Sequence, residues 1–292
     1  MKYLPLTRLL LSLVLSTPMS AAAAESREPS APAAIIGIDH IPVAVTDLDS
    51  AATRYRQLGF SLKPGRHHDN GLRNSHVKFP DGSGMELISP PLEAADDLAQ
   101  HYVNHLRQGE GPAYLSFHAR DWSALQSALR SADIGFRDEG LLTLDDPALG
   151  FLFFVHDNRS ASDKPEHFSH DNGAVAMTGV WLALDDSARD RVRRLLMALG
   201  AASTTETVFA AEAIEAEVFL VRNGRIVVLP QSHQLQLGRP VIRAEFRVRD
   251  LSLIAQGSGS MARELRDAKG GRNYVVPPQD AHGIWLEFHQ AP

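Results

Sequence analysis

An imidazole and a carboxylate stand inside two apolar stretches that otherwise have the character of buried strands. The first stretch is "GIDHIPVAVTDLD", Gly37 to Asp49, which carries His40, and the second is "GMELIS", which carries Glu86. Side chains alternate between the two faces of a strand, so the branched residues around His40 fall on one face and His40 shares the other with small residues. Such a face suits the concave, pocket-lining side of a sheet. An imidazole nitrogen and a carboxylate oxygen can together hold a divalent metal ion or exchange a proton with a bound molecule.

Simpler interpretations of these residues stay open. A strand His is often a core residue satisfied by hydrogen bonds, and a Glu near a strand end is often solvated. Tyr114 offers a hydroxyl to a pocket, or lies in the core with that hydroxyl bonded. The donor-rich loop "GRHHDNGLRN" contains His67 and Asn74. Ligand-contacting residues favour such loops, although the loop also has ordinary turn chemistry.

Composition narrows the chemistry. The chain has 292 residues and is 44% hydrophobic and 22% charged, which fits one large or two modest domains with a proper core. It has no cysteine, so disulfides, thiolate metal sites and cysteine nucleophiles are excluded, and His, Asp and Glu remain as metal ligands. The formal net charge is −6 without a block of Lys and Arg, which argues against a nucleic-acid partner. No G-x-S-x-G, Walker or H-E-x-x-H motif occurs. The stretch "GSGSMA", Gly257 to Ala262, matches a dinucleotide-binding pattern but lacks the strand–turn–helix context that such a site requires.

The first 24 residues have the features of a secretory signal peptide. A basic start precedes a short apolar run from Leu9 to Leu15, and the small residues Ala22, Ala23 and Ala24 stand before Glu25. The apolar run is too short to span a membrane. Residues 25–34 are expected to form a flexible leader. We therefore expect a periplasmic or secreted protein that has no membrane contact after cleavage.

Four segments repeat one plan: an apolar strand, an Asp, an amphipathic helix and further strands. The Asp residues recur at intervals of about 65–75 residues and can cap the helices that follow them; they are Asp47, Asp121, Asp185 and Asp250. In the fourth segment "SLIAQGSGS" is expected as an insertion between Asp250 and a helix beginning at Met261. Each unit is predicted as strand–helix–strand–strand–strand, with a polar linker at residues 161–173.

The stretches "DHIPVAVTDLDSAATRYRQLGF", "PGRHHDNGLRNSHVKFPDGSGMELIS" and "FFVHDNRSASDKPEHFSHDNGA" carry a family resemblance. They resemble the vicinal oxygen chelate superfamily, which includes glyoxalase I and the extradiol dioxygenases, and more narrowly the glyoxalase-like proteins of bacteria. The likeness covers most of residues 35–292. It implies an α+β fold of tandem βαβββ modules paired into two glyoxalase/dioxygenase-like domains, at 35–160 and 174–292. These motifs are specific to the fold and not to one reaction.

The resemblance also implies a site in the first unit. The first and last strands of a unit would lie side by side, which would make His40 and Glu86 metal ligands. Glu86 would also be the catalytic residue that exchanges a proton. His67 and Asn74 match the family's loop that orients the substrate.

Further metal ligands in this superfamily come from a second unit, and here the chain departs from the pattern. The position that matches His40 holds Tyr114 in the second unit and Arg243 in the fourth. His118 and Glu287 are the remaining candidates for a further metal ligand, and Tyr114 is a candidate substrate contact.

The candidate site and the superfamily resemblance lead to two possible functions. The first is a metal-assisted lyase, isomerase or ring-cleaving dioxygenase that acts on a small oxygen-rich molecule, with Zn, Fe, Mn or Ni as the ion. The alternative is a metal-free protein of the same fold that binds or sequesters a small molecule. A homodimer is compatible with either function.

Overall fold

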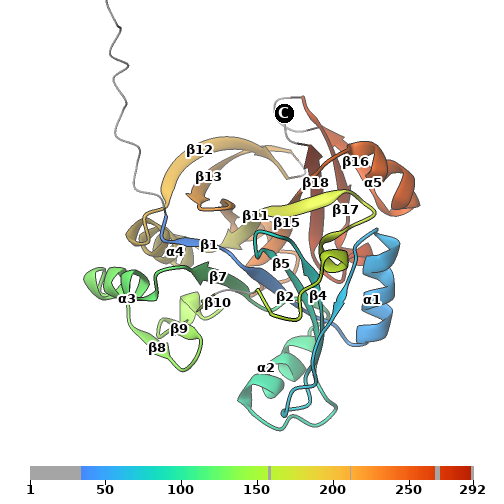
Figure 1. The fold of residues 1–292 in the computed structure, drawn as a ribbon. Helices are drawn as coiled ribbons and strands as arrows, with labels where there is room; N and C mark the ends of the chain where they lie inside the picture. The colour runs from blue at the N-terminus through green and yellow to red at the C-terminus, as the bar shows by residue number, and fades with distance from the viewer. Residues whose placement is uncertain (1–33, 157–158, 211, 267–269, 291–292) are drawn as a thin grey trace, which may run out of the picture. The chain divides into compact units, whose positions relative to one another are not determined.

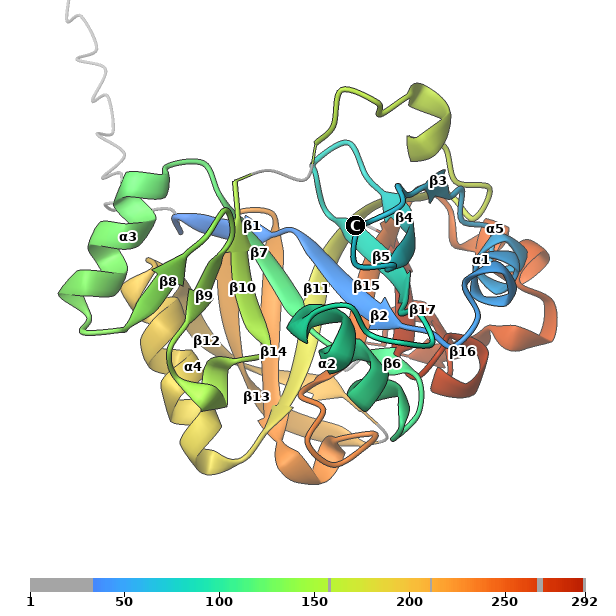
Figure 2. The same cartoon turned by 90° about the horizontal axis from the view of Figure 1, so that it is seen from below.

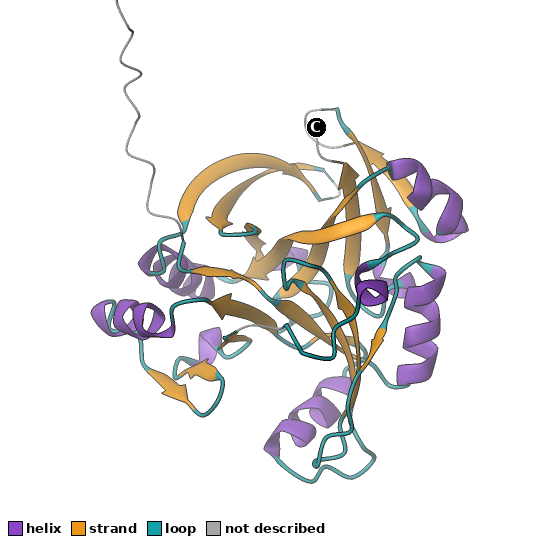
Figure 3. Cartoon of the chain, viewed as in Figure 1, coloured by secondary structure: helices purple, strands orange, loops and turns teal. Residues whose placement is uncertain are grey.

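The computed structural model describes residues 34–156, 159–210, 212–266 and 270–290. Four βαβββ units follow one another along this part of the chain, which confirms the expected α+β fold (Figures 1 and 3). The predicted signal peptide and nearly all of the predicted leader lie outside the described residues. No helix within the described ranges is both long and apolar enough to cross a membrane.

The first two units are joined by a short helix and strand. The first unit contains β1 (Ile36–Ile38), β2 (His40–Ala44), α1 (Leu48–Gln57), β3 (Lys63–Pro64), β4 (Arg73–Lys78) and β5 (Gly84–Ser89). The connection contains α2 (Asp97–Leu106) and β6 (Gly111–Pro112). The second unit contains β7 (Leu115–Ala119), α3 (Trp122–Ser131), β8 (Phe136–Asp138), β9 (Leu142–Leu144), η1 (Pro147–Leu149) and β10 (Leu152–Val155).

The last two units have longer strands. The predicted linker contains the 3-10 helix η2 (Pro165–Phe168). The third unit contains β11 (Ala174–Leu184), α4 (Asp186–Ala198), β12 (Ala202–Phe209), β13 (Ala213–Val221), β14 (Gly224–Pro230) and η3 (Gln231–His233). The fourth contains β15 (Val241–Val248), α5 (Leu251–Gly257), η4 (Gly259–Met261), β16 (Arg263–Arg266), β17 (Arg272–Val276), η5 (Pro278–Asp280) and β18 (Trp285–Gln290).

The strands form three sheets. Their orders are β3-β4-β5-β2-β6, β1-β7-β10-β9-β8 and β12-β13-β14-β11-β15-β18-β17-β16. The first and last strands of each unit pair in parallel, as β2 with β5, β7 with β10, β11 with β14 and β15 with β18. Strands β1 and β2 follow one another but belong to different sheets, so the chain passes between sheets at Asp39 (Figure 2).

Local sequence signals account for the helix starts. Each predicted Asp cap accepts a hydrogen bond from a backbone N–H in the first turn of its helix, which fills a donor left free there; the caps are Asp47, Asp121, Asp185 and Asp250. The predicted alternation of the first strand is also present, because Ile41 and Val43 are fully buried in the core whereas His40 is half-buried on the other face.

The fourth unit differs from its prediction. The segment expected as an insertion is itself helix α5, and Asp250 caps it directly. The helix expected from Met261 is instead the end of η4, and strand β16 follows it. Leu251 and Ile254 are three residues apart and both buried. The apolar spacing of a helix is therefore present at the start of the segment predicted as an insertion.

Candidate functional site

Strands β2 and β5 bring His40 and Glu86 together. The strands run parallel, and Glu86 lies opposite Pro42, two residues after His40. The Nε2 atom of His40 is 3.3 Å from Oε2 of Glu86, and each side chain is 12% exposed. The neighbours that point the other way, Ile41 and Leu87, are fully buried. The alternation of strand side chains therefore places both polar groups on the same open face of the sheet.

Asp39 holds the other side of the His40 ring. It is fully buried at the break between β1 and β2, and its backbone N–H donates to the carbonyl of Ser116. Nδ1–H of His40 donates to Oδ1 of Asp39, which directs Nε2 toward Glu86. The second oxygen of Asp39 has no hydrogen-bond partner in the described part of the chain. A carboxylate behind an imidazole fixes its tautomer and orientation, as it does for many metal-binding and catalytic histidines.

Strand β4 adds a polar row to the same face. Nδ2 of Asn74 donates to Oε1 of Glu86 at 2.6 Å, and His76 lies directly opposite Glu86 in the pairing of β4 with β5. Lys78 follows two residues after His76. Sequence reasoning identified Asn74 but missed His76 and Lys78. Counting alternate residues onward from Asn74 would have found both, because β4 is a regular strand.

These side chains line a cavity of about 610 Å³, which we call the first hollow. Besides His40, Asn74 and Glu86, its lining is rich in cations and imidazoles, namely Lys63, Arg66, His68, His76, Lys78 and Arg159. Serines of the following segment also reach it, and Asp163 accepts hydrogen bonds from Lys63 and Lys78. The predicted His67 is exposed and is not part of this lining; its neighbour His68 is.

His40 and Glu86 form an ion pair. Burial disfavours a charge on His40, but the hydrogen bonds and negative charges of Asp39 and Glu86 outweigh it and raise the pKa of His40 to about 10. Burial raises the pKa of Glu86, but the hydrogen bond and charge of His40 outweigh it, with a contribution from Asn74, and lower this pKa to about 2. Burial also lowers the pKa of His76 to about 4, against the attraction of Glu86. At neutral pH an imidazolium–carboxylate pair therefore stands beside a neutral imidazole.

Tyr114 and His118 lie outside the first hollow. Tyr114 lines a different cavity together with His101, and burial raises the pKa of its hydroxyl to about 12. Nε2 of His118 accepts a hydrogen bond from Arg222 at 2.8 Å, and its Nδ1 faces the carbonyl of Ile38 at 3.2 Å. Both ring nitrogens of His118 are therefore occupied by protein groups.

Glu287 also lies elsewhere. It lines a cavity on the eight-stranded sheet, where Arg243 donates to its Oε2 and Asn273 to its Oε1, each at 2.7 Å. Glu287, a candidate for a further metal ligand, therefore does not lie beside His40 and Glu86. The physical reason is the strand pairing: β18 pairs with β15 and β17, and β5 pairs with β2 and β4, in a separate sheet.

The donor set fits a metal ion held by two protein ligands. Across the described ranges, no three His, Asp or Glu side chains are arranged to hold an ion together. His40 and Glu86 nevertheless present facing atoms 3.3 Å apart. Ligands about 2.1 Å from one ion lie roughly 3 Å from each other, so this pair is placed as neighbouring ligands. Nε2 of His40 would have to lose its proton on binding, as metal ligands generally do.

Residues 38–200 match the family model described as a glyoxalase-like domain, which is more than half of the chain. The chain belongs to this family. The matched range contains every residue that lines the first hollow, whereas the fourth unit lies beyond it. No curated protein matches the chain in sequence.

Solved structures with a similar fold support the superfamily resemblance. A mutant of 4-hydroxymandelate synthase from Streptomyces coelicolor has a TM-score of 0.59 at 13% identity, over 87% of this chain and 91% of that one. Homoprotocatechuate 2,3-dioxygenase from Brevibacterium fuscum, in complex with 3,4-dihydroxyphenylacetate, has a TM-score of 0.58 at 14% identity, over 90% and 83%. A fusion protein of a xylose isomerase-like TIM barrel and 4-hydroxyphenylpyruvate dioxygenase has a TM-score of 0.59 at 14% identity, over 90% of this chain and 51% of its own length, so the chain spans about half of it. At these identities the likeness shows the fold alone.

Proposed function

We propose that the first hollow is the active site of a metal-assisted enzyme, of the lyase, isomerase or ring-cleaving dioxygenase type, which acts on a small oxygen-rich molecule. The observation that carries the proposal is the placement of His40 and Glu86, 3.3 Å apart on adjacent parallel strands in a cavity. Membership of the glyoxalase-like family supports it. So does a protein of similar fold that was solved with a small dihydroxylated acid.

In this proposal His40 and Glu86 would hold a Zn, Fe, Mn or Ni ion, which would supply Lewis-acid polarisation of substrate oxygens. Asp39 keeps Nε2 of His40 directed at the cavity, and Asn74 keeps one oxygen of Glu86 occupied, so that the other oxygen faces His40. The basic lining attracts a substrate that carries negative or partially negative oxygens. His76 is neutral, and it lies opposite Glu86, where it can accept a proton from the bound molecule.

A second function is favoured by a different observation. The hollow is lined by four cationic side chains, Lys63, Arg66, Lys78 and Arg159, and the described residues offer no third metal ligand. A metal-free pocket of this kind would bind an oxyanion through charge-assisted hydrogen bonds. The protein would then retain its ligand without converting it.

Elemental analysis of the native protein separates the two functions. The enzyme is expected to carry one of the four transition metals at near one equivalent, and Glu86→Gln is expected to lose it because a ligand oxygen is gone. Glu93→Gln removes an exposed carboxylate outside the hollow and serves as the matched control. Calorimetric titration of metal-depleted protein gives a readout that does not depend on activity. Protein that carries no transition metal and takes none up in the titration would contradict the enzyme.

We also propose that the protein is exported. The support is the pattern of residues 1–24, with its short apolar run and small residues before Glu25. N-terminal sequencing of the protein recovered from a periplasmic fraction is expected to start at or near Glu25. A chain that starts at Met1 and remains in the cytosolic fraction would contradict export.

A further inference from the structure

The fourth unit repeats the arrangement of the first hollow with different side chains. Glu287 of β18 lies opposite Glu245 of β15, two residues after Arg243. The same register relates Glu86 to His40 in the first unit. Arg243 donates to one oxygen of Glu287 and Asn273 donates to the other, as His40 and Asn74 do for Glu86.

The triad of Arg243, Asn273 and Glu287 cannot bind a metal ion as proposed for His40, Asn74 and Glu86. A guanidinium has only donors and stays protonated, so Arg243 cannot be a metal ligand. It is also almost fully buried, and it stacks on the Trp181 ring at 4.0 Å. The carboxylate of Glu287 is nevertheless part of a cavity wall. A different ligand chemistry must apply on this side of the molecule.

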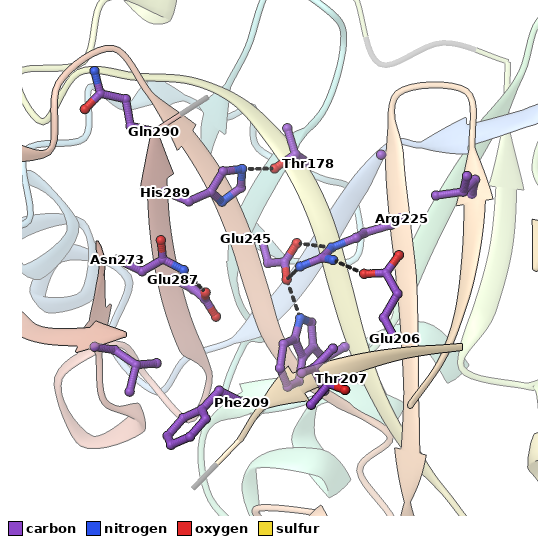
Figure 4. Close-up of a pocket in the computed structure, with 15 residues that line it drawn as sticks. Thr178, Glu206, Thr207, Phe209, Arg225, Glu245, Asn273, Glu287, His289 and Gln290 are labelled. Atoms are coloured by element: carbon purple, nitrogen blue, oxygen red, sulfur yellow. Dashed lines mark hydrogen bonds and ion pairs between the residues drawn. The ribbon is translucent and has the colours of Figure 1, made fainter. Parts of the chain in front are cut away.

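The cavity beside this triad has a volume of about 500 Å³, and we call it the second hollow. It lies on the eight-stranded sheet, and residues of β12 and β13 line it. These two strands form a curved hairpin (Figure 1). Its apolar lining includes Val208, Phe209, Leu220 and Leu265. Its polar lining converges from β11, β12, β14, β15, β17 and β18 (Figure 4). Apolar walls with a few placed polar groups are typical of small-molecule sites of this size.

Charge in the second hollow is not balanced. Arg225 donates twice to Glu245, at 2.7 and 2.9 Å, and once to Glu206 at 3.0 Å (Figure 4). Arg243 is matched by Glu287, so the two guanidinium groups bonded within this network face three carboxylates. A further guanidinium, Arg247, lies opposite His289 on β15 but is exposed and is not part of the lining. Burial and repulsion from Glu245 raise the pKa of Glu287, as an excess of negative charge would. Burial lowers the pKa of His289, which therefore adds no compensating charge at neutral pH.

Glu206 is the carboxylate whose charge is left over. Its Oε2 accepts a single bond from Nη1 of Arg225, which donates to Glu245 through Nε and Nη2. Its Oε1 has no hydrogen-bond partner among the described residues. The side chain is 36% exposed and lines the hollow from strand β12. A ligand in the hollow would meet this oxygen without displacing an ion pair.

We propose that the second hollow binds a small organic cation, an ammonium group carried on a short apolar or aromatic body. The ammonium supplies the missing positive charge and donates to Glu206 and Glu287. The body packs against Phe209, Leu220 and Leu265. An anion would meet unmatched carboxylates instead. Both guanidinium groups are already bonded to protein carboxylates, and the unpartnered Nε of Arg243 is buried in a side chain outside the lining. This site does not depend on the proposed chemistry of the first hollow.

Calorimetric titration of the full-length protein with two probes tests the proposal. Phenethylamine carries an ammonium group on a short aromatic body, and phenylacetate carries the opposite charge on a similar body. Phenethylamine is expected to bind at least about tenfold more tightly than phenylacetate, and Glu206→Gln is expected to weaken its binding at least about tenfold. Arg225 keeps its two bonds to Glu245 in this variant, so the fold should survive.

Two variants serve as controls. Glu215→Gln removes the same charge from the adjacent strand β13 outside the lining, and Glu86→Gln removes it from the first hollow. Both are expected to leave phenethylamine binding unchanged to within about twofold. The proposal is overturned by no binding of phenethylamine at millimolar concentration, by equal binding of phenylacetate, or by an equal loss in Glu215→Gln. If Glu206→Gln does not fold, Leu220→Trp narrows the same wall and must weaken binding instead.

Discussion

The two hollows share a strand register and differ in the cation that faces the carboxylate. In the first hollow an imidazole backed by a buried carboxylate is open to the cavity, and His40 and Glu86 are each 12% exposed. In the second, Arg243 and Glu287 are 5% and 8% exposed. An imidazole can release its proton and accept an ion, whereas a guanidinium keeps its charge permanently. One residue on the first strand of the unit therefore decides whether this geometry offers an exchangeable or a fixed cation.

The surroundings of Glu86 and Glu287 also differ, and those of Glu287 carry more charge. Pro42 lies opposite Glu86 in the first hollow, whereas the equivalent position in the second holds the further carboxylate of Glu245. Gly179 makes room for it, because a Cβ there would lie 2.1 Å from Oε2 of Glu245. The second hollow is thus built around a buried ionic network, and the first around one pair beside a basic cavity.

The largest expected effect comes from removing the fixed cation. Arg243→Met leaves Glu287 and Glu245 with one guanidinium fewer in a buried site, and it is expected to reduce the free energy of unfolding by about 3–5 kcal/mol. His40→Gln keeps a donor beside Glu86 in a cavity that water can enter, and is expected to cost about 1–2 kcal/mol. Urea unfolding of both variants measures the difference. Equal losses would mean that both triads serve stability alike.

The comparison becomes sharper if the cation of the first hollow is exchanged. His40→Arg gives the first triad the composition of the second, and it is expected to keep an ion pair with Glu86 while metal binding is lost. Loss of a ligand should exceed the roughly 10–100-fold that removal of an outer partner costs. Metal content and calorimetric titration report the loss. Arg243→Lys, beside the second hollow, is the control and should leave metal binding unchanged. Unchanged metal content in His40→Arg would show that the ion, if present, is held elsewhere.

Most of the fold could be predicted from the sequence because its signals are local. The alternation around His40 and the four Asp caps act within a few residues, and the structure contains both. The start of α5 was misplaced because the polar "GSGS" after Ile254 obscured a short helix. A helix of only two turns contains too few apolar positions for its periodicity to predict it.

The site was less predictable because it depends on pairing between distant strands. The proximity of His40 and Glu86 followed from the family resemblance, and no property of either strand alone requires it. Asp39 was adjacent in sequence, but its role appears only once the chain is seen to break there and turn the side chain behind the ring. The equivalence of Arg243 and His40 was recognised, yet the cavity beside Arg243 depends on the long hairpin of β12 and β13.

A smaller effect is expected from the residue that positions His40. Asp39→Asn keeps the shape of the side chain but removes the charge behind the imidazole, and it is expected to weaken metal affinity about 10–100-fold. Calorimetric titration measures the affinity, and Asp49→Asn is a matched control on an exposed helix turn. An affinity equal to that of the native protein would show that Asp39 serves only the strand break.

The smallest expected effect is a pH dependence that only the first hollow should show. The pKa of His40 is raised from its ordinary value of 6.5 to about 10, so its contribution to the stability of the metal-free protein is complete below 6.5 and is lost as the pH rises through 10. The pKa of Glu86 is lowered from 4.5 to about 2, so its contribution is present above 4.5 and is lost as the pH falls through 2.

NMR titration of the His40 ring should show an imidazolium at pH 8, and Glu86→Gln should lower the pKa of His40. Because a guanidinium keeps its charge permanently, His40→Arg should remove the alkaline part of the dependence. A neutral His40 ring at pH 8 in the native, metal-free protein would contradict the ion pair with Glu86. The ion pair of Arg243 with Glu287 would then have no counterpart in the first hollow.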